Sequence, residues 1–358
     1  MSYRLGLIGV GAIGQLHAQS AVRAGVEVAG FCDILPERIE EMTEKYPDAL
    51  ATTDVDELLA AKDIDAVVVA VPNRLHKDFA IKAMKAGKDV LLEKPMALNR
   101  AECDEIIAVM KKTGRLVQLG FVCRCARTTR ALMTFIESGR LGRIYHARAA
   151  WVRRRGIPGL GRWFTTKSEA GGGVLIDLGV HMVDLIMHLT GRPTALRVSG
   201  ACTSTFGAPI RKYVYTEMFA GPPNLKGKFD VEDSAMGMIR FEGGLTVELA
   251  LSWAANVPEE LLPSGITLLG EKGGCFYDIW TDKFIIATEQ DGHLVDVKPH
   301  LEGGNPWDHA FQYEHELFAE SVTKRAPPAA SAEHGREVQA ILDALYRSSD
   351  EGREVEVG

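Results

Sequence analysis

The sequence predicts an α/β protein in which an N-terminal doubly wound parallel sheet is followed by an α+β domain with a large open, mostly antiparallel sheet. Three observations support this prediction. The chain has 358 residues, more than one ordinary core holds, and its 46% of hydrophobic residues is enough for two cores. Apolar strands alternate with amphipathic helices in the first third, as in parallel sheets covered on both faces. Long strands of alternating apolar and polar residues dominate the rest, so we place the domains at residues 1–123 and 124–358.

The first domain is predicted from short apolar runs separated by helical segments. Its strands are expected at residues 3–10, 26–32, 66–71, 89–92 and 116–122, and its helices at 15–24, 35–45, 54–61, 76–86 and 100–113. Because these strands show almost no polar alternation, helices must cover both faces of their sheet.

A glycine turn joins the first strand to the first helix. It has the pattern Gly9-x-Gly11-x-x-Gly14, with Ala12 and Ile13 at the two spaced positions. Between a strand and a helix, one glycine permits the tight turn, one lets backbone approach a pyrophosphate, and one allows close helix packing. The amides at the helix N-terminus would hold the phosphates. The pattern therefore predicts a dinucleotide site of the Rossmann type.

Asp33 closes the second strand, nineteen residues after Gly14. A carboxylate at this place accepts hydrogen bonds from both ribose hydroxyls and repels a 2′-phosphate. We therefore expect NAD as the cofactor, with NADP less favoured.

The strand at residues 89–92 runs directly into Glu93-Lys94-Pro95. Open parallel sheets bind ligands at the carboxyl ends of their strands, and a proline-fixed turn there would project Lys94 into that crevice. The alternative is a solvated surface charge, the commoner role of a lysine at a strand end.

The second domain is predicted from its strands. We expect a bridging helix at residues 130–138, strands at 144–155, 196–205, 234–241, 245–253, 265–269, 284–289 and 294–298, and closing helices at 307–323 and 334–348. Glu242-Gly243-Gly244 has the composition of a hairpin turn. Residues 206–228, rich in proline, glycine and tyrosine, are expected to form a long loop, either a flap over the site or an oligomer contact. Whether the last helix packs back on the first domain is left open.

A helix is predicted to follow Gly171-Gly172-Gly173 and to carry two stripes. One stripe is apolar, with Leu178, Met182, Leu185 and Leu189, and the other is polar, with Asp177, His181, Asp184 and His188. Asp177 and His181 lie one turn apart, close enough to act together. The polar stripe is either a chemical face or the solvated side of an ordinary amphipathic helix.

Five motifs follow one another along the chain: Gly9-x-Gly11-x-x-Gly14, Asp33, Pro72-Asn73-x-x-His76, Glu93-Lys94-Pro95 and Asp177-x-x-x-His181. Together they resemble the glucose-fructose oxidoreductase and inositol dehydrogenase family, over essentially the whole chain. The resemblance implies a nucleotide domain joined to an open antiparallel sheet, and substrates among sugars, cyclitols and glycosides. It places in the cofactor site, beside the glycine turn and Asp33, the residues Pro72, Asn73, His76, Glu93 and Lys94. It also implies that Lys94, Asp177 and His181 surround the reacting carbon.

The three residues around the reacting carbon suit the oxidation of a secondary alcohol. That reaction moves a hydride to nicotinamide and a proton to a base, so a group titrating near neutrality must reach the hydroxyl. His181 suits this role, while Lys94 would orient the hydroxyl and stabilise alkoxide character. Asp177 would hold a substrate hydroxyl or orient the imidazole. Whether Lys94 or His181 takes the proton stays open, as does the direction in the cell, because the same site run backwards reduces a keto group.

The substrate pocket is expected near residues 150–155. If they form one strand, Trp151, Arg153 and Arg155 share a face, and Trp163 follows a glycine-rich bend. Aromatic surface and guanidinium groups there would line a pocket for a sugar or an acidic sugar. The alternative is a basic strand edge that only discourages pairing. Two further candidates are Arg124 and His309.

Composition narrows the possible partners and surroundings. A formal net charge of -7 argues against a nucleic-acid surface. The six cysteines include no CxxC pair, as expected of reduced thiols in a cytoplasm. No signal-peptide pattern opens the chain and no uninterrupted apolar run approaches a membrane span, so we expect a cytoplasmic protein without membrane contact. The exposed face of an antiparallel sheet needs covering, and we expect a homodimer or homotetramer formed through it.

Two rival interpretations concern metal binding and catalysis. His181, Asp184 and His188 offer an i, i+3, i+7 set of metal ligands. Residue 184 is also often acidic in the resembling family without a metal, so we expect none. The other rival is a non-catalytic NAD-binding sensor of the same fold, which the presence of Lys94 and His181 disfavours.

Overall fold

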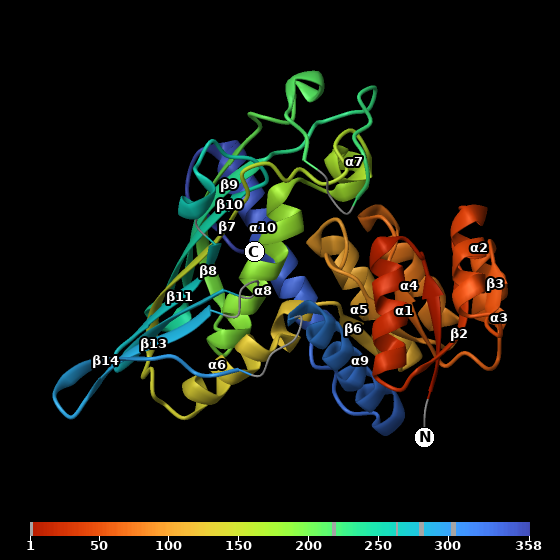
Figure 1. The fold of residues 1–358 in the computed structure, drawn as a ribbon, viewed down its shortest axis with the longest axis horizontal. Coiled ribbons are helices and arrows are strands. Elements are labelled where there is room, and N and C mark those ends of the chain that lie inside the picture. The colour runs from red at the N-terminus through yellow and green to blue at the C-terminus, as the bar shows by residue number, and fades with distance from the viewer. Residues whose placement is uncertain (1–2, 217–219, 263, 279–282, 302–305) are drawn as a thin grey trace. The chain divides into compact units, whose positions relative to one another are not determined.

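The computed structural model describes residues 3–216, 220–262, 264–278, 283–301 and 306–358. The chain divides into two compact units (Figure 1). Unit 1 comprises Met1–Val122 and Ala310–Gln339, and unit 2 comprises Cys123–His309 and Ala340–Gly358.

Unit 1 contains a six-stranded parallel sheet in the order β3-β2-β1-β4-β5-β6. Its strands are β1 (Arg4–Ile8), β2 (Glu27–Cys32), β3 (Leu50–Thr52), β4 (Ala66–Val69), β5 (Asp89–Leu92) and β6 (Val117–Leu119). The winding reverses between β1 and β4, and open α/β sheets bind their ligands at the carboxyl ends of strands beside such a reversal. The glycine turn follows β1 and the Glu93-Lys94-Pro95 turn follows β5, so both motifs lie at this edge.

Helices supply the apolar cover of this sheet. They are α1 (Ala12–Arg23), α2 (Pro36–Lys45), α3 (Val55–Ala60), α4 (His76–Lys85), α5 (Arg100–Thr113) and the unit 1 part of α9 (Pro306–Lys324). One buried cluster joins Leu7 and Phe31 of the strands to Met42 of α2 and Phe318 of α9. The rings of Phe318 and Tyr3 meet edge to face at 5.8 Å. This segment from the end of the chain therefore belongs to unit 1 because it completes an apolar face.

Unit 2 is built on a nine-stranded sheet in the order β14-β13-β12-β11-β7-β10-β9-β8-β15. Its strands are β7 (Ile144–Val152), β8 (Ala195–Thr203), β9 (Ser234–Phe241), β10 (Thr246–Ser252), β11 (Ser264–Gly270), β12 (Gly273–Asp278), β13 (Lys283–Gln290), β14 (His293–Val297) and β15 (Val355–Glu356). All neighbours pair antiparallel except β7 and β10, which run parallel. The predicted fold class is confirmed.

The strand β10 shows how the alternating sequence builds this sheet. Val247, Leu249 and Leu251 are buried while Glu248 between them is exposed. The hairpin from β9 to β10 closes through Glu242–Gly244, as predicted. Alternation thus assigns one face of the sheet to a core.

That core is formed with α6 (Arg127–Glu137), α8 (Val180–Leu189) and the unit 2 part of α10 (Ala332–Glu351) (Figure 1). A short helix α7 (Lys167–Ala170) and a π-helical turn at Leu175–Gly179 precede α8. Length and composition alone would let Lys167–Leu189 cross a membrane, but 89% of that window is buried inside the fold. The stretch is therefore a core helix.

Several elements differ from the expected ones. β3, β12 and β15 were not predicted, because β3 and β15 are very short and β12 begins with two glycines, which are poor strand formers. Within residues 206–228, those that the structure describes form no helix or strand except the 3-10 turn Ile210–Lys212, as expected of a loop.

Candidate active site

The glycine turn lies between β1 and α1, and two of its glycines are required by close backbone packing. A Cβ on Gly14 would lie 2.0 Å from the carbonyl oxygen of Gly9, and one on Gly9 would lie 2.4 Å from that of Ala70. Gly9 also has a φ of +88°. Gly11 precedes the first residue of α1. Because glycine has no side chain, nothing at this position caps the first backbone N–H groups of the helix. The first amides of α1 are therefore suited to phosphate oxygens.

Asp33 is held firmly at the carboxyl end of β2. Its Oδ2 accepts the backbone N–H of Val10 at 2.9 Å, and its Oδ1 accepts that of Leu35 at 3.0 Å. The guanidinium of Arg38 lies 3.2 Å from Oδ2 and also borders Gly11. Arg38 was not predicted, and it places a positive charge beside the carboxylate that would read the ribose.

Asn73 and His76 lie in the short helical segment that follows β4, and both are buried. His76 Nδ1 lies 2.6 Å from the carbonyl oxygen of Pro95, and Nε2 lies 2.9 Å from that of Val71. Burial lowers the pKa of His76, which favours the neutral ring. The ring therefore braces the end of β4 against the turn that contains Lys94.

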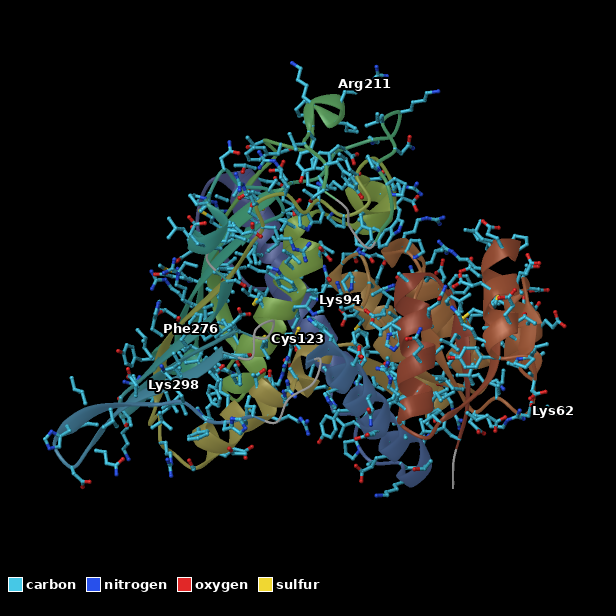
Figure 2. The ribbon with its side chains drawn as sticks, in the orientation of Figure 1. Lys62, Lys94, Cys123, Arg211, Phe276 and Lys298 are labelled. Carbon is cyan, nitrogen blue, oxygen red and sulfur yellow. The ribbon has the colours of Figure 1, made fainter. Side chains whose placement is uncertain are left out.

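Lys94 follows β5 and is half-buried (Figure 2). The Lys94–Pro95 peptide bond is cis. The preceding Glu93 is buried, and its carboxylate lies 2.8 Å from Nε2 of His17 and accepts the backbone N–H of Lys94 at 3.1 Å. Glu93 was predicted for the cofactor site, and in the structure its carboxylate binds the backbone of the turn that carries Lys94.

The start of the Asp177 and His181 helix is held by a buried carboxylate. Glu232 accepts the backbone N–H groups of Gly173 and Leu175 at 2.9 Å, and the hydroxyl of Tyr346 at 2.8 Å. A Cβ on Gly173 would lie 1.9 Å from the carbonyl oxygen of Glu232, so only glycine fits there. The π-helical turn that follows is of a kind frequent at functional sites, because it widens the helix locally.

Asp177 and His181 each contact a side chain that sequence reasoning missed. The buried indole of Trp253 donates from Nε1 to Asp177 Oδ2 at 2.9 Å. The sulfur of Cys123 lies 3.6 Å from His181 Nδ1, and the His181 ring lies 6.1 Å from the ring of Trp151. The alternative of a solvated stripe is wrong for His181, which is only 8% exposed.

Trp151 and Arg153 come together beside this helix, whereas Arg155 leaves the strand. The guanidinium carbon of Arg153 lies 5.1 Å from the ring centre of Trp151. Burial lowers the pKa of Arg153, and the charge of Asp177 opposes that shift. β7 ends at Val152, so the predicted strand to residue 155 is too long; Arg155 instead lies 4.9 Å from the ring centre of Phe206. After the bend at Arg154, Arg155 forms only an isolated bridge with Ala254.

The remaining substrate candidates take structural or peripheral places. Arg124 forms a buried, two-pronged ion pair with Asp184, with Nε 2.7 Å from Oδ2. Trp163 stacks on Phe164 with ring centres 3.8 Å apart. His309 is exposed in the first turn of α9. Arg124 therefore neutralises a core carboxylate of α8, and its contact with a substrate stays a prediction.

The metal ligands of the rival interpretation are not arranged as a site. The carboxylate of Asp184 is engaged by Arg124, and Arg192 lies 3.7 Å from its Oδ1. Across the part of the chain that the structure describes, no group of three or more His, Cys, Asp or Glu side chains could hold a metal ion.

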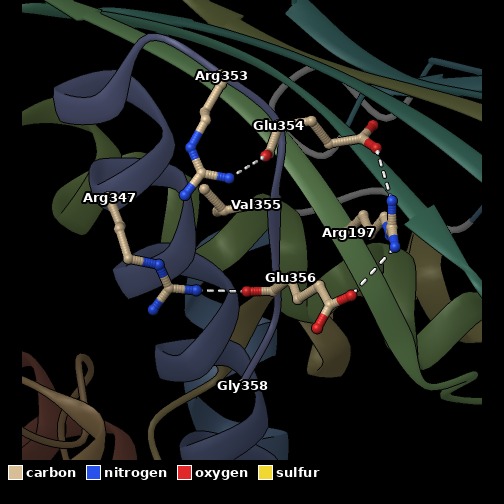
Figure 3. Close-up of a pocket in the computed structure, with 7 residues that line it drawn as sticks. All are labelled: Arg197, Arg347, Arg353, Glu354, Val355, Glu356 and Gly358. Carbon is tan, nitrogen blue, oxygen red and sulfur yellow. Dashed lines mark hydrogen bonds and ion pairs between the residues drawn. The ribbon is translucent and has the colours of Figure 1, made fainter.

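A surface pocket at the C-terminal edge of the unit 2 sheet is drawn in Figure 3. It is lined by Arg197, Arg347, Arg353, Glu354, Val355, Glu356 and Gly358, and contains none of the predicted site residues. Arg197 pairs with Glu356 at 3.1 Å, and Arg347 donates to the Glu356 carbonyl oxygen. These contacts hold β15 to β8 and to α10.

The predicted catalytic residues are divided between the two units. Lys94 lies in unit 1, at the same sheet edge as the glycine turn and Asp33. Asp177 and His181 lie in unit 2, with Trp151 and Arg153. A joint site formed by all three stays a prediction.

Comparisons with known proteins give this arrangement a family. Residues 3–121 match the model of an oxidoreductase family with an NAD-binding Rossmann fold, and residues 129–275 match the GFO/IDH/MocA C-terminal domain. The chain is 30% identical to D-glucoside 3-dehydrogenase of Escherichia coli over 99% of this chain and 97% of that protein. It is 26% identical to myo-inositol 2-dehydrogenase of Thermotoga maritima, over 99% and 98% of the two chains.

The fold is also that of solved structures. Levoglucosan dehydrogenase in complex with NADH superposes with a TM-score of 0.86 at 22% identity, over 100% of both chains. An NAD-binding oxidoreductase from Klebsiella pneumoniae gives a TM-score of 0.85 at 19% identity. With the glycine turn, the Glu93-Lys94-Pro95 turn and the Asp177 and His181 helix in their places, the chain belongs to the GFO/IDH/MocA family of oxidoreductases.

Proposed function

We propose that this protein is an NAD-dependent oxidoreductase that transfers a hydride between nicotinamide and a secondary hydroxyl, or the corresponding keto group, of a sugar, glycoside or cyclitol. The observation that supports this most is the Asp177 and His181 pair beside Trp151 and Arg153. An indole face and a guanidinium suit the apolar ring faces and hydroxyl edges of such substrates. Relatives named as a glucoside dehydrogenase and an inositol dehydrogenase act on this class.

The residues of the chain would divide the work as follows. NAD, when bound at the glycine turn, supplies the hydride acceptor. The sulfur of Cys123 lies 3.6 Å from Nδ1 of His181, and the opposite nitrogen, Nε2, would act on the substrate hydroxyl. Lys94 orients that hydroxyl and stabilises negative charge on its oxygen, while Asp177, fixed by Trp253, holds a second hydroxyl or the imidazole. Either Lys94 or His181 takes the proton.

The test is absorbance of reduced nicotinamide with NAD and a panel of sugars, glycosides and cyclitols. His181→Ala should lower turnover about 10²- to 10⁴-fold with NAD affinity kept, because a proton-transfer group is lost and the nucleotide site is untouched. Lys94→Ala should lower turnover on the same substrate at least as strongly, to a small residual rate. Unchanged turnover in both variants would contradict the assignment, and NAD binding without turnover on any substrate would favour the sensor.

We also propose that Asp33 sets the preference for NAD over NADP. Asp33→Ala removes the carboxylate that repels a 2′-phosphate and frees the Arg38 guanidinium, now 3.2 Å from it, to pair with that phosphate. The ratio of kcat/KM for NADP to that for NAD should rise at least about 10-fold. Adding Arg38→Ala should remove most of the gain with NADP. A ratio that Asp33→Ala leaves unchanged would refute the role of Asp33.

The protein is further proposed to associate as a homodimer or homotetramer through the outer face of the unit 2 sheet. Met236 is 64% exposed, and Met238, Leu269 and Phe276 are each 37% to 39% exposed. Large apolar side chains on one sheet face are typical of an association surface.

A further inference from the structure

A line of buried hydrogen bonds in unit 1 reaches the turn of Lys94 from inside the fold. His315 Nε2 of α9 lies 3.1 Å from His17 Nδ1 of α1, and His17 Nε2 lies 2.8 Å from Glu93 Oε1. The two histidines are 0% exposed and Glu93 is 8% exposed. We call these three residues the His–His–Glu line. Three titratable side chains from three separate elements thus meet away from solvent.

The protons of the line have one consistent placement. Among the described residues, none offers a hydrogen-bond partner to His315 Nδ1, and a buried N–H without an acceptor costs more than a bare lone pair. His315 therefore carries its proton on Nε2 and donates it to His17 Nδ1. Burial, with His17 close by, holds the pKa of His315 well below its usual range, in agreement with a neutral ring. His17 in turn donates from Nε2 to Glu93.

Both oxygens of Glu93 are then occupied by donors. Oε1 accepts from His17, and Oε2 accepts the backbone N–H of Lys94 at 3.1 Å. A Cβ on Gly120 would lie 3.0 Å from Oε1, so the glycine after β6 makes room for the carboxylate. Donors that all point toward one carboxylate polarise one another and strengthen the end of the line.

Other titratable groups around the line support this charge placement. Burial, with Glu93 nearby, keeps the pKa of Glu314 well above its usual range, so the residue next to His315 is an uncharged acid. His76 contacts the Pro95 carbonyl oxygen, and burial lowers its pKa.

We propose that His17 and His315 are positioning residues for the oxidoreductase reaction, acting through Glu93 on the backbone from which the Lys94 side chain leaves the sheet. The proposal rests on the proposed function of Lys94. Without the line, the Glu93 carboxylate loses the hydrogen bond from His17 and turns or takes up a proton, which releases the Lys94 amide. A displacement of a reacting group by about 1 Å costs on the order of 10²-fold in rate.

The first experiment compares His17→Phe with His17→Gln. The amide Nε2 of glutamine can donate to Glu93 as the imidazole does, whereas phenylalanine fills the space without a donor. We expect His17→Phe to lower kcat about 10- to 100-fold with the Kd for NAD within about 2-fold, and His17→Gln to recover most of the loss. Ser20→Ala, a buried change on the same helix, is the matched control. Equal kcat in His17→Phe and the unchanged protein would overturn the proposal.

A double variant separates positioning from general damage. If His17 acts through Lys94, adding His17→Phe to Lys94→Ala should cause no further loss of kcat/KM. Multiplying losses would overturn the proposal. Should His17→Phe not fold, His315→Phe, one bond further along the line, is expected to give a smaller loss of the same kind.

A last readout does not depend on finding the substrate. The rate at which an amine reagent modifies Lys94, followed against pH by peptide mass spectrometry, reports the surroundings of its amine. We expect this rate to change several-fold in His17→Phe and to return toward the original in His17→Gln. A changed labelling rate without turnover on the panel would support the positioning of Lys94 by the His–His–Glu line and contradict the proposed function. An unchanged labelling rate would contradict the positioning of Lys94 by this line.

Discussion

At the scale of single residues, the position of the Asp177 carboxylate depends on a hydrogen bond from Trp253. Trp253→Phe keeps a buried aromatic ring and removes the indole N–H that donates to Asp177 Oδ2 at 2.9 Å. A hydrogen bond to a charged group contributes about 1.5–3 kcal/mol, so turnover should fall roughly 10- to 100-fold while NAD affinity is kept. Steady-state kinetics and NAD titration measure the two effects. In an Asp177→Ala background Trp253→Phe should have no further effect on turnover, and a second, independent loss would contradict this role.

The same residues show what the sequence can and cannot predict. Asp177 and His181 are one helical turn apart, so their spacing alone indicates a common site. Trp253 is 76 residues from Asp177, and Cys123 is 58 residues from His181. Contacts at such separations follow from strand order, which local patterns do not contain. Cys123 carries no separate signal, because buried cysteines are common in cores.

At the scale of elements, the helix that carries Asp177 and His181 is a core helix whose polar side chains are also largely buried. The alternating stripes predicted two faces, yet Asp184 is only 1% exposed because Arg124 neutralises it inside the fold. The π-helical turn was also missed, since hydrogen-bond pitch has no marker in residue type. Gly172 has a reason that sequence does not show: a Cβ there would lie 2.0 Å from the hydroxyl oxygen of Tyr346.

His188 on this helix should make stability depend on pH. Burial, with the positive charges of Arg124 and Arg192, lowers its pKa from 6.5 to about 4. A folded-state pKa below the unfolded value means that the fold binds the proton less tightly, so this stability is present above pH 6.5 and is lost as the pH falls toward 4. The loss should be about 1–3 kcal/mol.

Urea unfolding at pH 7 and pH 4.5 tests this dependence. His188→Gln, which does not titrate, should lose less free energy of unfolding between the two pH values than the original protein does. His293→Gln, at an exposed position of β14, is the matched control and should follow the original protein. Parallel curves for His188→Gln and the original would contradict the assignment.

At the scale of the whole molecule, the order of sequence patterns was enough to predict the fold class. The change from continuous apolar strands to alternating ones coincides with the change from a parallel to a mostly antiparallel sheet. Packing of the last helix on the first domain was left open, and the structure divides that helix, α10, between the two units after Gln339. The membership of most of α9 in unit 1 was not predicted, because it depends on Phe318 filling an apolar face made some three hundred residues earlier. Chain topology, rather than local pattern, decides where a late helix packs.

The outer face of the unit 2 sheet should hold copies of the chain together. Met236 and Phe276 project from it, 64% and 37% exposed, and a charge at either place would have to be desolvated in a sheet-to-sheet contact. Light scattering should give a dimer or tetramer for the original protein and a monomer for Met236→Glu combined with Phe276→Glu, with the far-ultraviolet circular dichroism unchanged. Val22→Glu, at a 51% exposed site on α1, should leave the assembly intact. A monomeric original protein would refute the association, whereas a double variant that stays assembled would move the contact to another surface.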